Sequence, residues 1–121
     1  MRILNEMYIL VNVNMVKVDL QVALGEHPEI KQWAYIIHDK DNAVPHYHIY
    51  LNLGFSPASC YDVASWLQLP CWSVEILRGE TRDLFLYFMH SAGCEINKHE
   101  YSISDFVSNF DIKALISGRR Q

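Results

Sequence analysis

Apolar residues recur along the chain in four segments that predict β-strands. Residues 6–13 (EMYILVNV) form a continuous β-prone run, which is typical of a buried strand. Residues 32–38, 46–53 and 71–77 are similar, and 46–53 (HYHIYLNL) alternates between two faces. Because residues 39–45 have the composition of a turn, the second and third strands are expected to form a hairpin.

Segments with helical spacing separate these strands. They cover residues 19–30, 56–67, 81–90 and 111–116, with a loop expected over residues 92–104. Asp19 is the expected N-cap of the first helix, Ser56 and Pro57 open the second, and Gly118 closes the last. The order strand–helix–strand–strand–helix–strand–helix predicts an α+β fold. It is an antiparallel sheet of four to five strands with helices packed on it, close to the ferredoxin-like arrangement.

Composition describes an ordinary globular domain. The 121 residues are half apolar and one fifth charged, and no linker divides them, so residues 1–121 are expected to form one domain. No run is apolar and long enough to span a bilayer, and the N-terminus does not resemble a signal peptide, which predicts a cytoplasmic protein with no membrane partner. The three cysteines lack C-x-x-C spacing and are expected to be free thiols. A net charge of −4 weighs against a nucleic-acid partner, although a bound cation and a short single-stranded site would need few phosphate contacts.

The hairpin carries candidate metal ligands. His46 and His48 lie two apart on a strand and therefore point to the same face. His38 joins them if it pairs with His46 across the hairpin, and Asp41 in the turn can direct its carboxylate towards the same ion. Mixed nitrogen and oxygen ligands suit Mn²⁺ or Mg²⁺, although Zn²⁺ would also bind. A register shift of one residue would remove His38 from this face.

Tyr87 is the candidate nucleophile among the seven tyrosines. Helical spacing places it at the rim of the apolar face formed by Leu84, Phe85 and Phe88. At the rim, the ring can anchor in the core while the hydroxyl reaches a cleft. Tyr50 shares the face of the histidines, where a supporting role is expected.

Several strings resemble the HUH endonucleases. Residues 38–41 (HDKD) and 45–50 (PHYHIY) are similar to the metal-binding motifs of the nicking domain of plasmid rolling-circle replication initiators of the RepB type. Residues 86–90 (LYFMH) resemble the catalytic tyrosine motif of that family, and residues 98–101 (KHEY) and 109–112 (NFDI) resemble segments that follow it. The matches occur in the family's order from about residue 33 to residue 112.

The resemblance implies an HUH fold and a metal-dependent, sequence-specific enzyme that nicks and rejoins single-stranded DNA. His38, Asp41, His46 and His48 would hold Mn²⁺ or Mg²⁺. Tyr87 would form a 5′-phosphotyrosine intermediate that initiates rolling-circle replication, and Tyr101 matches a position that is not the nucleophile. The implied substrate is a stem-loop at a replication origin in a bacterial host. Lys40, Arg78, Arg82 and Lys98 are candidate phosphate contacts. Family members often carry an oligomerisation or helicase domain, so a longer natural protein could form an oligomer.

Three alternatives stay open at this point. A histidine-triad nucleotide hydrolase would need a third histidine where this chain has Tyr50. A non-catalytic RRM-like module would carry stacking aromatic residues on its sheet face, within a sequence string that mixes basic and aromatic residues. This sequence contains no string of that kind. A single-tyrosine transposase or relaxase would use the same chemistry, but the HDKD and KHEY strings favour the replication initiators.

Overall fold

A computed structural model describes residues 5–40, 44–56, 58–90 and 100–117. Its core is a five-stranded antiparallel sheet in the order β4-β1-β3-β2-β5. The strands are β1 (Glu6–Asn12), β2 (Gln32–His38), β3 (His46–Asn52), β4 (Val74–Ile76) and β5 (Val107–Ser108). The strands β4-β1-β3-β2 lie in the order of a ferredoxin-like fold. The predicted α+β class and its antiparallel sheet are confirmed.

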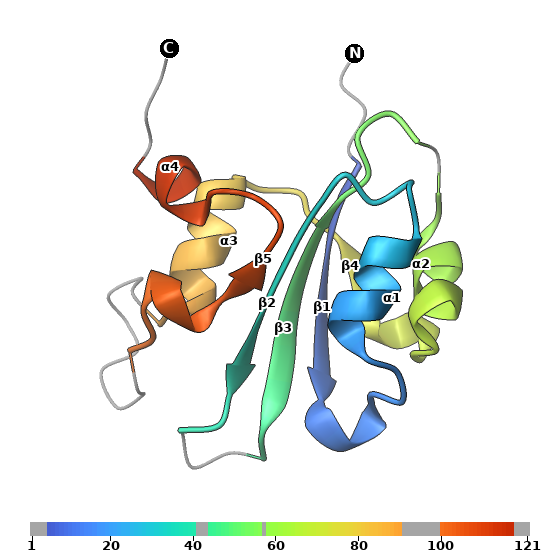
Figure 1. Ribbon diagram of the computed structural model, residues 1–121, viewed down its shortest axis with the longest axis horizontal. Helices are drawn as coiled ribbons and strands as arrows, with labels where there is room; N and C mark the ends of the chain where they lie inside the picture. Colours follow the sequence, from blue (N-terminus) through green and yellow to red (C-terminus); the bar gives the residue numbers. More distant parts are fainter. Residues whose placement is uncertain (1–4, 41–43, 57, 91–99, 118–121) are drawn as a thin grey trace.

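Helices cover both faces of the sheet (Figure 1). On one side lie α1 (Leu20–Glu26) and α2 (Cys60–Leu67), and on the other lie α3 (Thr81–Phe88) and α4 (Ile112–Ile116). Short 3₁₀ turns occupy Val13–Met15, Cys71–Ser73 and Ile103–Asp105. None of the described helices combines the length and apolar character needed to cross a bilayer.

Alternation along the strands creates two separate hydrophobic clusters. Ile9, Ile49 and Leu51 belong to the cluster beneath α1 and α2, and each is fully buried. Ile36 and Tyr50 point the opposite way and pack with α3 in the second cluster. Because successive strand residues face opposite sides, β3 serves both clusters and is the central strand of the fold.

Several predicted boundaries were wrong by a few residues. Helix α2 begins at Cys60, not at residue 56, because Ser59 caps it and forms a capping box with Asp62. The predicted first helix ends at Glu26, ahead of Pro28. The predicted strand 71–77 is reduced to three residues because Cys71–Ser73 form a 3₁₀ turn. Strand β5 was not predicted, and the proposed stop at Gly118 lies outside the described residues.

Candidate metal centre and its tyrosine

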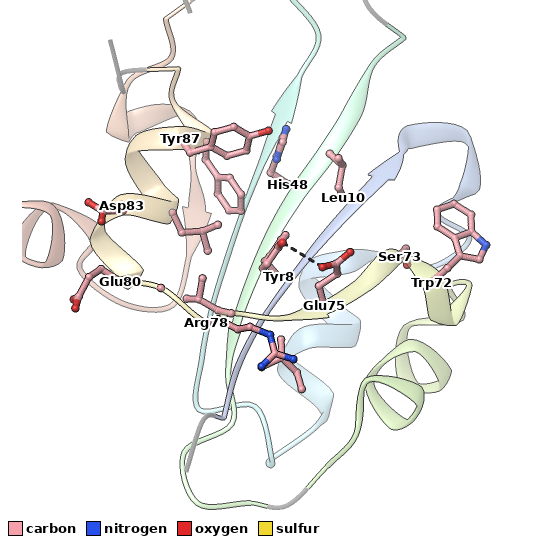
Figure 2. Close-up of a pocket in the computed structure, with 15 residues that line it drawn as sticks. Tyr8, Leu10, His48, Trp72, Ser73, Glu75, Arg78, Glu80, Asp83 and Tyr87 are labelled. Carbon is pink, nitrogen blue, oxygen red and sulfur yellow. Dashed lines mark hydrogen bonds between the residues drawn. The ribbon is translucent and has the colours of Figure 1, made fainter. Parts of the chain in front are cut away.

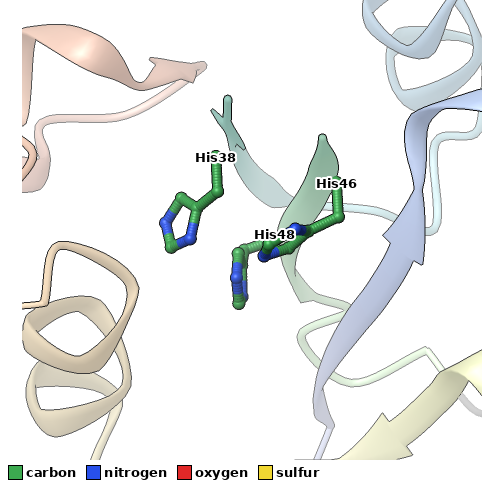
Figure 3. Close-up of side chains that lie close together, drawn as sticks. All are labelled: His38, His46 and His48. Atoms are coloured by element: carbon green, nitrogen blue, oxygen red, sulfur yellow. The ribbon is translucent and has the colours of Figure 1, made fainter. Parts of the chain in front are cut away.

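Three histidines meet at the end of the β2–β3 hairpin (Figure 3). His38 is the last residue of β2 and pairs directly with His46 of β3, while His48 lies two residues further along β3. This is the register in which all three share one face. One ring nitrogen of each lies within 4.8 Å of the others, so the three residues could hold a metal ion. Asp41, the expected fourth ligand, lies outside the described residues.

Backbone carbonyls fix the ring nitrogens of two histidines. Nδ1 of His46 lies 2.9 Å from the carbonyl oxygen of Val44, and Nε2 of His38 lies 2.5 Å from that of Phe88. A carbonyl oxygen can only accept a hydrogen bond, so these two nitrogens carry the protons. In the neutral ring, the lone pair then lies on Nε2 of His46 and Nδ1 of His38. Metal-ligating histidines are usually held in this way, and the donor set therefore fits a cation.

Tyr101 and His90 enclose the buried side of the histidine cluster. His38 and His48 are only 1% and 5% exposed. The Tyr101 ring stacks on His38 with a centroid separation of 4.4 Å, and its hydroxyl accepts a hydrogen bond from the Lys40 amide. The ring centroid of His90 lies 4.5 Å from that of His38. The backbone of His90 is in the left-handed region, with φ of 60°. The contacts of Tyr101 and His90 with His38 could not be predicted from the sequence, because no periodic pattern links residues so distant along the chain.

Tyr87 lies beside this cluster on helix α3. Leu84, Phe85 and Phe88 are buried, whereas Tyr87 is 49% exposed, as its rim position predicted. Its ring centroid is 6.2 Å from that of His48, and Figure 2 shows its hydroxyl directed towards the His48 side. A phenol and a histidine cluster that could bind a cation therefore face the same space.

A partly buried polar network holds the first turn of α3. The hydroxyls of Tyr50 and Thr81 both donate to Oε2 of Glu6, at 2.6 Å and 2.5 Å. Burial, followed by the hydrogen bond to Glu6, raises the pKa of Tyr50, so this phenol remains a donor across the physiological range. The network joins β1, β3 and α3, and it fixes the helix that carries Tyr87.

The candidate phosphate contacts occupy different environments. Lys40 lies 3.7 Å from the carboxylate of Asp39, and Nε of Arg82 donates to the carbonyl oxygen of Ile116, which links α3 to α4. Arg78 lines a groove that Tyr87 and His48 also line. Lys98 lies outside the described residues.

The antiparallel α+β sheet, with its His-x-His strand beside a tyrosine-bearing helix, has the features of a plasmid replication initiator domain. The family described as "Plasmid replication protein, origin binding domain" matches residues 7–113, and the chain belongs to that family. It is also 29% identical over 102 residues to a curated "Replication protein" of Onion yellows phytoplasma (strain OY-M). That match covers 70% of this chain and 26% of the relative, so the chain spans about a quarter of the relative's length. These matches confirm the resemblance to plasmid replication initiators.

Proposed function

We propose that residues 1–121 form an origin-nicking domain that cuts and rejoins single-stranded DNA, with Tyr87 as the nucleophile. The observation that carries this proposal is the position of Tyr87 against the histidine cluster, at 6.2 Å between its ring and that of His48. Membership of the origin-binding family supports a DNA substrate at a replication origin. We infer a single-stranded site, such as a stem-loop, in the cytoplasm of a plasmid-bearing bacterium.

The histidines would hold a divalent cation through Nδ1 of His38, Nε2 of His46 and one nitrogen of His48. An imidazole-rich set suits Mn²⁺ better than Mg²⁺, which prefers oxygen ligands, and a carboxylate from Asp41 would improve the fit for either ion. Zn²⁺ is a competitor for such a site. When bound, the cation would polarise the scissile phosphate as a Lewis acid.

Tyr87 would supply the covalent step. Its phenolic oxygen forms a bond to phosphorus while the bond from phosphorus to the 3′ oxygen breaks. The phenolic proton passes to solvent, and the departing oxygen takes up a proton to become a 3′-hydroxyl that can prime synthesis. The 5′-phosphotyrosine retains the phosphodiester energy, so a later 3′-hydroxyl can attack it and rejoin the strands.

The test is a covalent adduct that survives denaturant. The wild-type chain, incubated with Mn²⁺ and a library of single-stranded oligonucleotides, should give a species of reduced mobility on a denaturing gel. Tyr87→Phe should abolish this species because the ring remains while the attacking oxygen is lost. Tyr61→Phe is the matched control, since Tyr61 is an exposed tyrosine on α2. An adduct that persists in Tyr87→Phe would assign the nucleophile to another residue, and full activity in EDTA would remove the metal from the proposal.

A further inference from the structure

A groove runs along the open part of the sheet next to Tyr87 (Figure 2). It has a volume of about 740 Å³ and lies between strands β1 and β4 on one side and helix α3 on the other. We call it the tyrosine groove and define it by Tyr8, Leu10, Trp72, Glu75, Arg78 and Tyr87. His48 also lines it, so the groove reaches the histidine cluster directly.

Exposed apolar side chains line this groove. Trp72 is 69% exposed and Leu10 is 47% exposed, although both belong to residue types that are normally buried. The same two residues also line a second hollow that continues past them to Val44 and His46. The surface next to the histidine cluster therefore offers water-facing apolar area, which is what unstacked bases need.

The charges of the groove are unfavourable for a phosphate backbone. Among the described residues that line it, the carboxylates are Glu75, Glu80 and Asp83, and Arg78 is the one cation. Carboxylates repel phosphates, but they accept hydrogen bonds from the exocyclic amino groups of cytosine and adenine. A DNA strand whose scissile phosphate sits near Tyr87 would therefore direct its bases, and not its phosphates, into the tyrosine groove.

Glu75 differs from the other two carboxylates. Glu80 is the N-cap residue of α3 and Asp83 lies in its first turn, where a negative charge stabilises the helix dipole. Glu75 belongs to the sheet, opposite Tyr8, whose hydroxyl donates to Oε1 of Glu75 at 3.4 Å. A carboxylate has about four acceptor sites, so this bond orients Glu75 while leaving it able to accept from a ligand.

We propose that the tyrosine groove binds unpaired bases next to the scissile phosphate, with Trp72 as the stacking platform and Glu75 as the acceptor that selects amino-bearing bases. This inference rests on the proposed nicking function, because the strand is placed by its phosphate at Tyr87. Trp72 determines affinity and Glu75 determines which base is preferred.

The test measures binding separately from nicking. Fluorescence anisotropy with labelled dC, dA and dT homo-oligonucleotides, in EDTA and in a Tyr87→Phe background, reports binding alone. Trp72→Ala should weaken binding to all three probes by roughly five-fold or more, and Trp72→Tyr should restore most of it. Tyr61→Ala removes an exposed aromatic residue from α2 and should leave binding unchanged.

Glu75→Gln should reduce the preference for dC and dA over dT by roughly five-fold, because an amide can also donate to the O4 of thymine. Glu26→Gln, at an exposed position of α1, is the matched control.

Unchanged binding in Trp72→Ala would overturn the stacking role. An equal gain for all three probes in Glu75→Gln would mean that Glu75 only repels phosphates, which overturns base selection. If the wild-type chain forms the adduct but Trp72→Ala binds oligonucleotides as the wild type does, the groove inference is wrong and the proposed nicking function is supported. If no adduct forms but Trp72→Ala weakens binding, the groove binds bases and the proposed nicking function is wrong.

Discussion

The two faces of the sheet differ in what they bury. Beneath α1 and α2, the strands contribute an unbroken apolar set that includes Ile9, Ile49 and Leu51. Beneath α3, the same strands contribute His38, His48 and Tyr50, which are buried just as deeply. Buried polar groups are costly unless they are hydrogen-bonded, so the second face depends on specific partners such as Glu6 and the Phe88 carbonyl.

This difference separates the face that serves folding from the face that carries the candidate site. The α1/α2 face needs only apolar residues of the right volume, and sequence changes there should act through folding. The α3 face needs particular atoms at particular positions, and part of it, around Leu10 and Trp72, stays open to solvent. One sheet therefore divides its alternating residues between an apolar core and a polar cluster that borders an open groove.

The largest effect on stability is expected from the apolar face. Leu51→Ala should lower the free energy of unfolding by roughly 2–5 kcal/mol, because Leu51 is fully buried and the site cannot collapse around the smaller residue. Leu10→Ala, on the open side, should change it by less than about 0.5 kcal/mol. Urea unfolding followed by circular dichroism measures both. Equal losses would mean that the two faces do not differ in their contribution to folding.

Metal binding should stabilise the chain through the α3 face. Mn²⁺ at 100 times its dissociation constant should add about 2.7 kcal/mol to the free energy of unfolding, since an ion held by the folded hairpin would have no such site in the unfolded chain. His46→Ala should remove this gain. His27→Ala is the matched control, because His27 stacks on Trp66 of α2, on the other side of the sheet. Thermal unfolding with and without Mn²⁺ is the measurement. A gain that survives in His46→Ala would place the ion elsewhere.

The sequence was sufficient for the parts of this site that depend on local periodicity. Strict alternation along residues 46–53 predicted that His46 and His48 share one face of their strand. The sequence left the register of the hairpin open, and the register found is the one in which His38 pairs with His46. Helical spacing predicted that Tyr87 lies at the rim of α3. Both predicted features follow from the geometry of a single strand or helix, which the order of residues determines directly.

Features that depend on distant contacts could not be predicted. Tyr101 stacks on His38 from 63 positions away, and Thr81 bonds to Glu6 across 75 positions. Strand β5 has two residues, which is too short for any alternation to appear. The start of α2 was predictable in principle, because Ser59 and Asp62 have the spacing of a capping box.

Alkaline pH should weaken the α3 face specifically. Burial raises the pKa of Tyr50 in the folded chain above the usual value near 10 of an unfolded tyrosine. The unfolded state therefore loses its proton first, and stability that is complete below pH 10 falls as the pH rises above it. The contribution of Tyr50 to the slope of unfolding free energy against pH should approach about 1.4 kcal/mol per pH unit, which is the limit for one proton. Tyr50→Phe should reduce the slope of urea stability against pH, measured in EDTA between pH 9 and about 11. An unchanged slope in Tyr50→Phe would mean that other tyrosines cause the loss of stability at alkaline pH.

Two substitutions with small and equal expected losses of unfolding free energy compare the two faces of the sheet, because one lies on α2 and the other on α3. Ser59→Ala removes the N-cap of α2, and Thr81→Val removes one of the two hydroxyls that donate to Glu6 at the start of α3. Each should cost about 1 kcal/mol of unfolding free energy.

Only Thr81→Val should also slow adduct formation, by on the order of three- to ten-fold, since a small shift of α3 moves the Tyr87 hydroxyl relative to the histidines. The rate is measured with saturating oligonucleotide and Mn²⁺, at a temperature where both variants are fully folded. If the two variants form the adduct equally fast, the Glu6 network serves stability alone. The position of Tyr87 would then be set by the packing of Phe85 and Phe88 beneath it.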